Sequence, residues 1–284
     1  MMRMLRRAVR LPLLVFLVLA GLAVVWARFS RIDLPARWHH IACWSRRLLR
    51  WCGMDFEEIA EPGAVPLSAL PGGRLIVANH VNWIDVYAID AVAPSMFVAK
   101  AEIRRWPVIG TLVDGVGTIF IERHRRHAVH EAVHRMADAM LSGHRVAVFP
   151  EGTTNDGTRL LRFHANTAEA ALRANVPVVP VALRYLTPAR ERCDAVAFVG
   201  DTSLLQSLWR MTAEPRIIVE MHVLPELEPS RFASRHALVR EAERLIAARL
   251  GVAAPDLSGP LDARLQSGAT ARAASGAAGD GAAG

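Results

Sequence analysis

A histidine and an aspartate five positions apart are the first side chains in this sequence whose types and spacing suit catalysis. His80 and Asp85 lie in the stretch Asn79-His-Val-Asn-Trp-Ile-Asp85, directly after the apolar run Leu75–Ala78, which reads as a buried strand. If the turn bends back, the carboxylate can hold one imidazole nitrogen and leave the other free to take a proton. The pair therefore predicts an acid-base dyad at a strand end, with a purely structural pair as the alternative.

Three further stretches follow in order, each at the end of a strand-like run or leading into one. They are Gly117–Arg123, Phe149–Thr153 and Val176–Ala182. Together with Asn79–Asp85 they resemble the four ordered motifs of the glycerolipid acyltransferase family, whose best-known members make phosphatidic acid from lysophosphatidic acid. The match spans about residues 76–183. The resemblance implies a mixed, mostly parallel α/β sheet covered by helices, with membrane-anchoring helices at the N-terminus.

The resemblance also implies the reaction. A fatty acyl group would pass from acyl-CoA or acyl carrier protein to the sn-2 hydroxyl of 1-acylglycerol 3-phosphate, giving phosphatidic acid, and no cofactor is needed. His80 would be the general base that deprotonates the lysolipid hydroxyl, and Asp85 would hold the imidazole and stabilise the imidazolium. Transfer would be direct, through a ternary complex without an acyl-enzyme.

Substrate contacts are expected from side chains in or beside the motifs. They are Asn79, Lys100, Gly117, Arg123, Glu151, Gly152, Thr153 and Arg159. Arginine suits phosphate oxygens because its fork donates two parallel hydrogen bonds, and a glycine leaves backbone N–H groups open to an oxyanion. Plain structural roles remain the alternatives: a turn cap for Asn79, a surface cation for Lys100 or Arg123, and a loop brace for Glu151.

One motif departs from the family pattern. After Gly152-Thr153 the family usually carries an arginine and a serine, whereas this chain continues Thr154-Asn-Asp-Gly-Thr-Arg159. A cation returns only at Arg159, which reaches the cleft if the chain turns at Asp156-Gly157. This form also resembles bacterial members that acylate lyso-ornithine lipid. Lysophosphatidic acid is the first choice of acceptor and lyso-ornithine lipid the alternative.

Composition favours a membrane partner over nucleic acid. The chain has 284 residues, a net charge of +7 and 52% hydrophobic residues, which fits one domain acting at an anionic lipid surface. Three cysteines without metal-type spacing indicate neither a disulfide framework nor a zinc site. The histidines at 124, 127, 130 and 134 complete no ligand pattern, so no metal is expected. An inactive membrane-binding scaffold is the rival of another class, disfavoured because the dyad, Glu151 and Arg123 are all present.

Two N-terminal segments are predicted to meet the membrane. Leu11–Ala27 lacks charge and would form a helix of roughly 26 Å, borderline for a span, with a cleaved signal peptide as the alternative. Leu34–Cys52 places tryptophans on one helical face and arginines on the other, which suits the headgroup region. The alternative is a helix packed on the domain with a solvated basic face. A bacterial-type inner membrane with a cytoplasm-facing site is expected, because thioester donors are cytoplasmic.

The remaining chain alternates between strands and helices, as an α/β domain does. Strands are predicted at 75–78, 96–99, 118–122, 146–149, 178–183, 196–199 and 217–223. Helices are predicted at 128–141, 165–174, 204–211 and 235–250. Prolines 177 and 180 predict an edge-like entry to their strand. The domain prediction is an anchor at 1–55, a catalytic domain at 56–252 and a Gly/Ala-rich disordered tail at 253–284.

Overall fold

The computed structural model describes residues 1–106, 109–122 and 126–255. Contacts group residues 1–254 into one unit that includes both N-terminal helices and the sheet. The predicted substrate contact Arg123 and, from residue 256 on, the predicted tail lie outside the described residues. Residues 1–55, the predicted anchor, belong to the same unit as the sheet.

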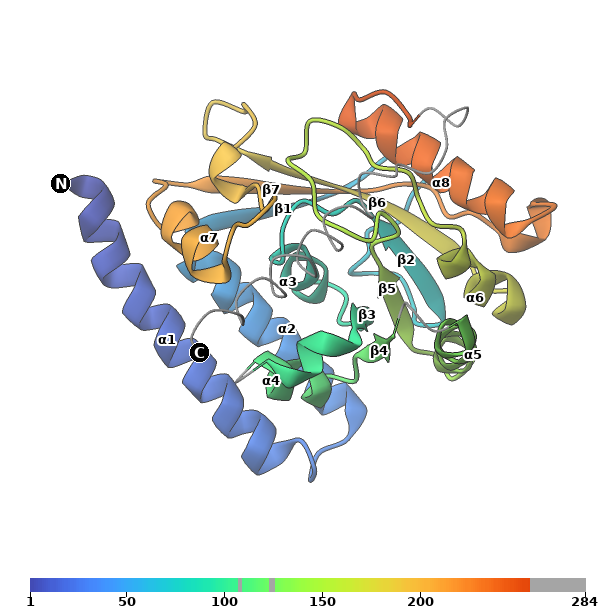
Figure 1. The fold of residues 1–284 in the computed structure, drawn as a ribbon, viewed down its shortest axis with the longest axis horizontal. Coiled ribbons are helices and arrows are strands. Elements are labelled where there is room, and N and C mark those ends of the chain that lie inside the picture. The colour runs from blue at the N-terminus through green and yellow to red at the C-terminus, as the bar shows by residue number, and fades with distance from the viewer. Residues whose placement is uncertain (107–108, 123–125, 256–284) are drawn as a thin grey trace, which may run out of the picture. The chain divides into compact units, whose positions relative to one another are not determined.

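A seven-stranded sheet of order β1-β7-β6-β2-β5-β3-β4 forms the centre of the described chain (Figure 1). The strands are β1 (Met54–Ala60), β2 (Arg74–Ala78), β3 (Met96–Lys100), β4 (Ile119–Ile121), β5 (Arg145–Val148), β6 (Val178–Leu186) and β7 (Ile217–Val223). Neighbouring strands are parallel except for β6 and β7. The predicted mixed, mostly parallel sheet is confirmed.

Helices cover both faces of the sheet. They are α1 (Met2–Arg28), α2 (Leu34–Trp51), α3 (Asp85–Asp90), α4 (Ile109–Gly115), α5 (Arg126–Leu141), α6 (Asn166–Ala174), α7 (Leu204–Met211) and α8 (Arg235–Leu250), with short 3-10 helices at Ala101–Arg105, Asp194–Val196 and Pro229–Arg231. One core cluster joins buried residues of α1, α2, α3 and α7, and the other those of α5, α6 and α8. In β2, Ile76 and Ala78 enter the first cluster, whereas Leu75 and Val77 enter the second. This period of two is the strand signal that the sequence carried.

Three local predictions were wrong. The segment predicted as a strand at 196–199 contains the end of the Asp194–Val196 3-10 helix and a loop, and Val196 is buried there without sheet pairing. Strand β1 was missed because it is a partly exposed edge strand with three acidic residues, which breaks the apolar pattern. β6 is central rather than edge-like. Pro180 fits because the ladder with β7 begins one residue later, at Val181, and the Pro180 carbonyl accepts from Leu224 N.

The apolar face of α2 packs against the domain. Ile41 and Leu48 are buried, and Trp44 Nε1 donates to the carbonyl of Leu17 in α1 at 2.9 Å. Arg46 and Arg50 on the opposite face are exposed. The tryptophan face predicted to meet lipid headgroups is therefore largely covered by protein, as in the alternative interpretation, because an amphipathic pattern alone does not say what covers its apolar side.

Helix α1 is held against the domain along its length. Near its start, Arg6 donates to the Ala213 carbonyl at 2.9 Å, and Arg10 donates to the carbonyls of Thr212 (3.2 Å), Glu214 (2.5 Å) and Pro215 (3.1 Å). These carbonyls belong to the segment that directly follows α7. Arginines that precede the apolar run are thus used to attach α1 to α7.

The face of α1 that points away from the domain is apolar and exposed. Helix α1 is the one helix in the described chain that is long and apolar enough to cross a membrane. Its exposed apolar residues include Met2, Leu5, Val9, Leu13 and Phe16. Near its C-terminal end, a Cβ added to Gly115 of α4 would lie 2.8 Å from Val25 Cγ1, so the two helices approach closely there. Both ends of α1 therefore touch the same unit.

Candidate active site

The site forms at the carboxyl edge of the parallel strands. β2 and β5 are parallel neighbours, with Val77 aligned to Val148, so the residues that follow them emerge side by side. His80 follows β2 and Glu151 follows β5, and the backbone N–H of His80 donates to Glu151 Oε1 at 2.7 Å. The predicted convergence of these two motifs is therefore observed.

His80 and Asp85 form the predicted pair. Nδ1 of His80 lies 2.8 Å from Asp85 Oδ2, which also accepts the backbone N–H groups of Val81 (2.7 Å) and Asn82 (2.9 Å). The other oxygen, Oδ1, accepts the Tyr185 hydroxyl at 2.5 Å. The Asp85 side chain is fully buried, whereas that of His80 is 19% exposed. A carboxylate only accepts, so Nδ1 carries a proton and Nε2 is left as the base.

An aromatic ring packs against one face of the His80 imidazole. Phe149 stacks on His80 with ring centroids 4.1 Å apart and planes 10° apart. Phe97 of β3 stacks in turn on Phe149 at 5.9 Å. The imidazole is thus held by a hydrogen bond at one nitrogen and by an apolar surface on one face, which restricts both its rotation and its contact with water.

Glu151 is a buried brace. Besides His80 N, it accepts Leu161 N at 2.9 Å and Asn155 Nδ2 at 2.6 Å, both on Oε2. Burial raises the pKa of Glu151 to about 7; the three donors oppose this rise, and the charge of Asp85 adds to it. Both oxygens are occupied by the protein, so the geometry favours the loop-bracing role over direct contact with substrate.

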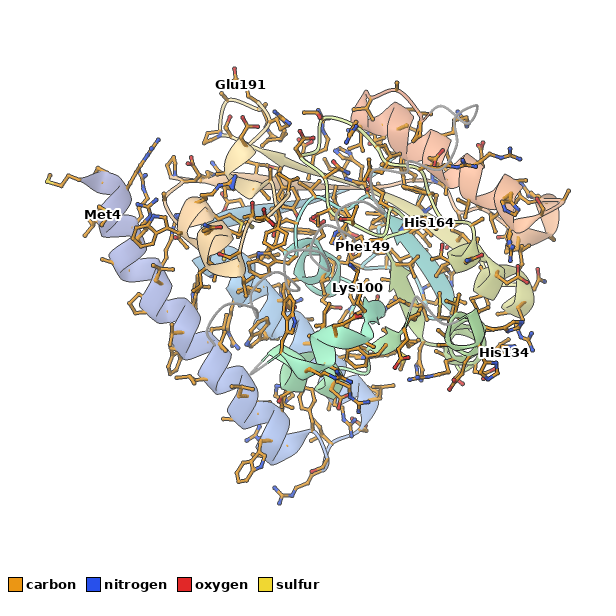
Figure 2. The ribbon with its side chains drawn as sticks, in the orientation of Figure 1. Met4, Lys100, His134, Phe149, His164 and Glu191 are labelled. Atoms are coloured by element: carbon orange, nitrogen blue, oxygen red, sulfur yellow. The ribbon has the colours of Figure 1, made fainter. Side chains whose placement is uncertain are left out.

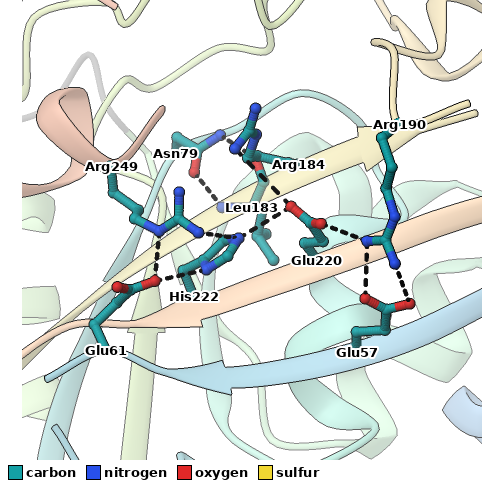
Figure 3. A network of polar contacts seen from close by, with 9 residues as sticks. All are labelled: Glu57, Glu61, Asn79, Leu183, Arg184, Arg190, Glu220, His222 and Arg249. Carbon is teal, nitrogen blue, oxygen red and sulfur yellow. Dashed lines mark hydrogen bonds and ion pairs between the residues drawn. The ribbon is translucent and has the colours of Figure 1, made fainter. Parts of the chain in front are cut away.

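Two other predicted substrate contacts are also used internally. The Asn79 side chain donates to the Leu183 carbonyl at 3.1 Å and accepts Leu183 N at 2.7 Å, which fastens β2 to β6 (Figure 3). The N–H of Gly152 donates to the Phe149 carbonyl at 3.0 Å in a turn where Gly152 has φ of 74°. Neither the amide of Asn79 nor the N–H of Gly152 is aimed at an oxyanion.

Gly117 lies away from the dyad. It precedes β4, so it sits at the amino edge of the parallel strands, and a Cβ there would lie 3.7 Å from Met96 at the start of β3. His80 lies at the carboxyl edge. The φ of 82° at Gly117 explains the glycine as a turn residue, and the predicted substrate contact is not supported by its position.

Two of the predicted substrate contacts, Lys100 and Arg159, are exposed cations. Lys100 closes β3 and is exposed (Figure 2). Arg159 is exposed on the loop after the Asp156-Gly157 turn, where Gly157 has φ of 76° and its N–H donates to Asn155 Oδ1 at 2.6 Å. Thr153 is half-buried earlier in that loop. Lys100 and Arg159 remain available to an anionic group.

Sequence reasoning missed two residues that organise the site. Asn155 connects the loops, since its N–H donates to the His80 carbonyl at 3.0 Å while its side chain binds Glu151. Tyr185 reaches Asp85 from β6. A signal for Tyr185 was present, because Val181, Leu183 and Tyr185 alternate in the sequence and share one buried face.

A second histidine with carboxylate neighbours proves to be structural. His222 of β7 is 1% exposed and lies 2.9 Å from Glu61 through Nδ1 and 3.1 Å from Glu220 through Nε2 (Figure 3). Arg249 of α8 reaches both Glu61 and His222. This network joins β1, β7 and α8 and leaves His222 enclosed, so it lacks the accessible nitrogen that a general base needs.

Among the described residues, no group of three or more histidine, cysteine or acidic side chains is placed to hold a metal ion. His130 and His134 of α5 stack with ring centroids 4.9 Å apart. His124 lies outside the described residues.

The chain is similar to a known protein family, to characterised relatives and to a solved structure. The Acyltransferase family model matches residues 66–184. Lyso-ornithine lipid O-acyltransferase of Pseudomonas aeruginosa is 36% identical over 260 residues, covering 89% of this chain and 96% of that protein. 1-Acyl-sn-glycerol-3-phosphate acyltransferase of Neisseria gonorrhoeae is 33% identical over 183 residues, covering 64% and 71%. The crystal structure of PlsC, the 1-acyl-sn-glycerophosphate acyltransferase of Thermotoga maritima, has the same fold, with a TM-score of 0.66 and 21% identity over 88% of this chain and 97% of that one.

Proposed function

This chain belongs to the acyltransferase family, and we propose that it transfers a fatty acyl group from a thioester donor to the hydroxyl of a lysolipid, with His80 as the general base. The observation that carries the proposal is the pairing of a partly exposed imidazole with a fully buried aspartate. That arrangement leaves Nε2 of His80 as the acceptor for a substrate proton.

We infer the steps of the reaction from the pairing of His80 with Asp85. Nε2 of His80 takes the proton of the lysolipid hydroxyl as that oxygen attacks the thioester carbonyl, and Asp85 stabilises the imidazolium that forms. Collapse of the tetrahedral intermediate forms the ester and breaks the carbon–sulfur bond. The imidazolium then gives its proton to the departing thiolate, which leaves as the free thiol of coenzyme A or of acyl carrier protein. No covalent acyl-enzyme is required.

We propose lyso-ornithine lipid as the acceptor, and three observations support it. A relative that matches 89% of this chain is a lyso-ornithine lipid O-acyltransferase. The position where the family usually carries an arginine holds Thr154, whose hydroxyl donates to the Phe198 carbonyl at 2.5 Å. Thr158 lowers the pKa of Asp156 in the same loop, so this carboxylate is charged at neutral pH and suits the amine of an ornithine headgroup better than a phosphate.

Lysophosphatidic acid, the first choice from sequence alone, is the second candidate. The 33% identity to 1-acyl-sn-glycerol-3-phosphate acyltransferase of N. gonorrhoeae favours it. Exposed Lys100 and Arg159 could receive its phosphate. Arg123, the phosphate ligand implied by the motif, lies outside the described residues.

We also propose that the enzyme binds one leaflet of a bacterial inner membrane on the cytoplasmic side, with α1 lying along the surface. The exposed apolar residues of α1 suit lipid contact. Arginine contacts near its start and the close approach at Gly115 near its end both bind it to the same unit. Leu205 and Trp209 of α7 are exposed apolar residues that also suit lipid contact. Arg7 of α1 binds this helix, because its Nε donates to the Trp209 carbonyl at 3.0 Å and its guanidinium lies 4.0 Å from the Trp209 ring centroid.

An acceptor panel tests the assignment. The purified enzyme in lipid vesicles receives labelled acyl-CoA or acyl carrier protein with lyso-ornithine lipid, lysophosphatidic acid or lysophosphatidylcholine. The highest kcat/KM is expected with lyso-ornithine lipid. A higher value with lysophosphatidic acid would move the assignment to the second candidate, and no transfer to any lysolipid would refute the proposed activity.

A further inference from the structure

We propose that Tyr185 is a positioning residue of the catalytic pair: its hydroxyl holds Asp85 in the rotamer that presents Oδ2 to His80 and limits the negative charge that the imidazole meets. The proposal rests on the function proposed above. It assigns to Tyr185 a role that acts through Asp85, without contact with the substrate.

The hydrogen bonds to Asp85 divide unequally between its two oxygens. Oδ2 accepts three N–H groups, from the His80 ring and from the backbone of Val81 and Asn82. Oδ1 accepts the Tyr185 hydroxyl, at 2.5 Å. Asp85 has no exposed side-chain surface, so water cannot replace this donor without a local rearrangement. Loss of the hydroxyl would leave a buried carboxylate oxygen unpaired.

The backbone of β6 fixes the tyrosine. Tyr185 is aligned with Val219 of β7, and its carbonyl accepts Cys193 N at 2.9 Å. Only 4% of the residue is exposed. The same strand is tied to the start of the catalytic turn, because Leu183, two residues earlier, binds Asn79. Tyr185 and His80 are therefore placed by one connected piece of sheet.

The chemical state of the tyrosine makes it a constant donor. Burial, together with the charge of Asp85 and the hydrogen bond to it, raises the pKa of Tyr185 well above its usual value. The hydroxyl thus stays protonated over the working range of the enzyme and donates to the carboxylate throughout. Because a donated hydrogen bond withdraws charge from the acceptor, Asp85 orients the imidazole while stabilising its protonated form less strongly.

The two tyrosines of the chain provide a matched pair of variants. Tyr185→Phe removes the hydroxyl at Asp85, and Tyr87→Phe makes the same change on α3. The Tyr87 ring packs against Trp44 and Trp83, with ring centroids 5.3 Å and 5.8 Å apart. Tyr185→Phe is expected to lower kcat on the order of 10- to 100-fold, the cost of misplacing a catalytic group. KM should change little, and the acidic limb of the kcat/KM profile should move to higher pH. Tyr87→Phe should keep the wild-type profile.

A purely structural role would give a different result. If Tyr185→Phe reduces activity only in proportion to the folded fraction, measured by circular dichroism, and keeps the wild-type pH profile, the positioning role is refuted. Complete loss of activity in His80→Ala beside an unchanged Tyr185→Phe would refute this inference alone, whereas full activity of His80→Ala would refute the proposed function.

A second measurement covers the case in which Tyr185→Phe does not fold. In the Tyr87→Phe background, biosynthetic incorporation of 3-fluorotyrosine alters position 185 alone, because the chain has no other tyrosine. The fluorinated hydroxyl is a stronger donor, so the acidic limb should move to lower pH. An unchanged limb, or a move to higher pH, would contradict the proposal.

Discussion

Replacement of Glu151 by glutamine tests the account of the buried brace. Glu151 is 2% exposed, and its pKa is raised by burial from an ordinary value of 4.5 to about 7. Between these two pH values the folded protein keeps a proton that the unfolded chain has released. The free energy of unfolding of the wild type therefore falls as pH rises, by about 1.4 kcal/mol per unit for this group.

The expected size of this fall in the free energy of unfolding follows from the same two pKa values. The loss begins near pH 4.5, is complete above about pH 7 and amounts to roughly 3 kcal/mol. Glutamine does not titrate, so Glu151→Gln should lack this loss and gain about that much stability relative to the wild type between pH 4.5 and 8. Acyl transfer should nevertheless fall, because an amide NH2 cannot accept a hydrogen bond. In Glu151→Gln it would stand either at Oε1, which accepts the backbone N–H of His80, or at Oε2, which accepts the backbone N–H of Leu161 and the side-chain amide of Asn155.

Urea unfolding in detergent micelles, followed by tryptophan fluorescence at several pH values, measures the difference. Glu241→Gln is the control, since its partner Arg244 lowers the pKa of Glu241 and the pH trend should be weak and opposite in sign. A constant stability difference between Glu151→Gln and the wild type from pH 4.5 to 8 would refute the reasoning.

Two further predictions concern the elements that hold the site. Asn79→Leu removes both hydrogen bonds to Leu183 and should lower the free energy of unfolding by about 2–4 kcal/mol. The urea midpoint measures this change, and a midpoint equal to that of the wild type would show that the two hydrogen bonds are dispensable. Arg10→Ala removes the contacts with residues 212, 214 and 215 and should increase protease cleavage after α7 in vesicle-bound enzyme, whereas Arg3→Ala at an exposed position should not. Equal cleavage of the two variants would contradict the docking of α1.

The parts of the site that sequence predicted are those that depend on local spacing. His80 and Asp85 are five residues apart and follow a buried strand, so their pairing needs only one turn. The meeting of His80 with Glu151 follows from the rule that parallel strands end at one edge. Tyr185 was missed because its partner is 100 positions away along the chain, and no local pattern states where a central strand will place a hydroxyl.

The differences between the sequence expectations and the structure have equally physical causes. Gly117 was assigned to the substrate by motif membership, whereas its strand direction places it at the opposite edge from His80. Helix α2 has the pattern of an interfacial helix, but the same pattern serves a helix whose apolar face covers a protein core. Strand β1 lies at an edge and keeps its acidic residues partly in water, which hides it from a search for apolar runs.

The role of His80 as the base is the central claim, and the rate of acyl transfer by His80→Ala in vesicles tests it most directly. The account predicts a fall of at least about 100-fold with an unchanged circular dichroism spectrum. A rate within about twofold of the wild type would contradict it, because general base catalysis contributes far more than that factor.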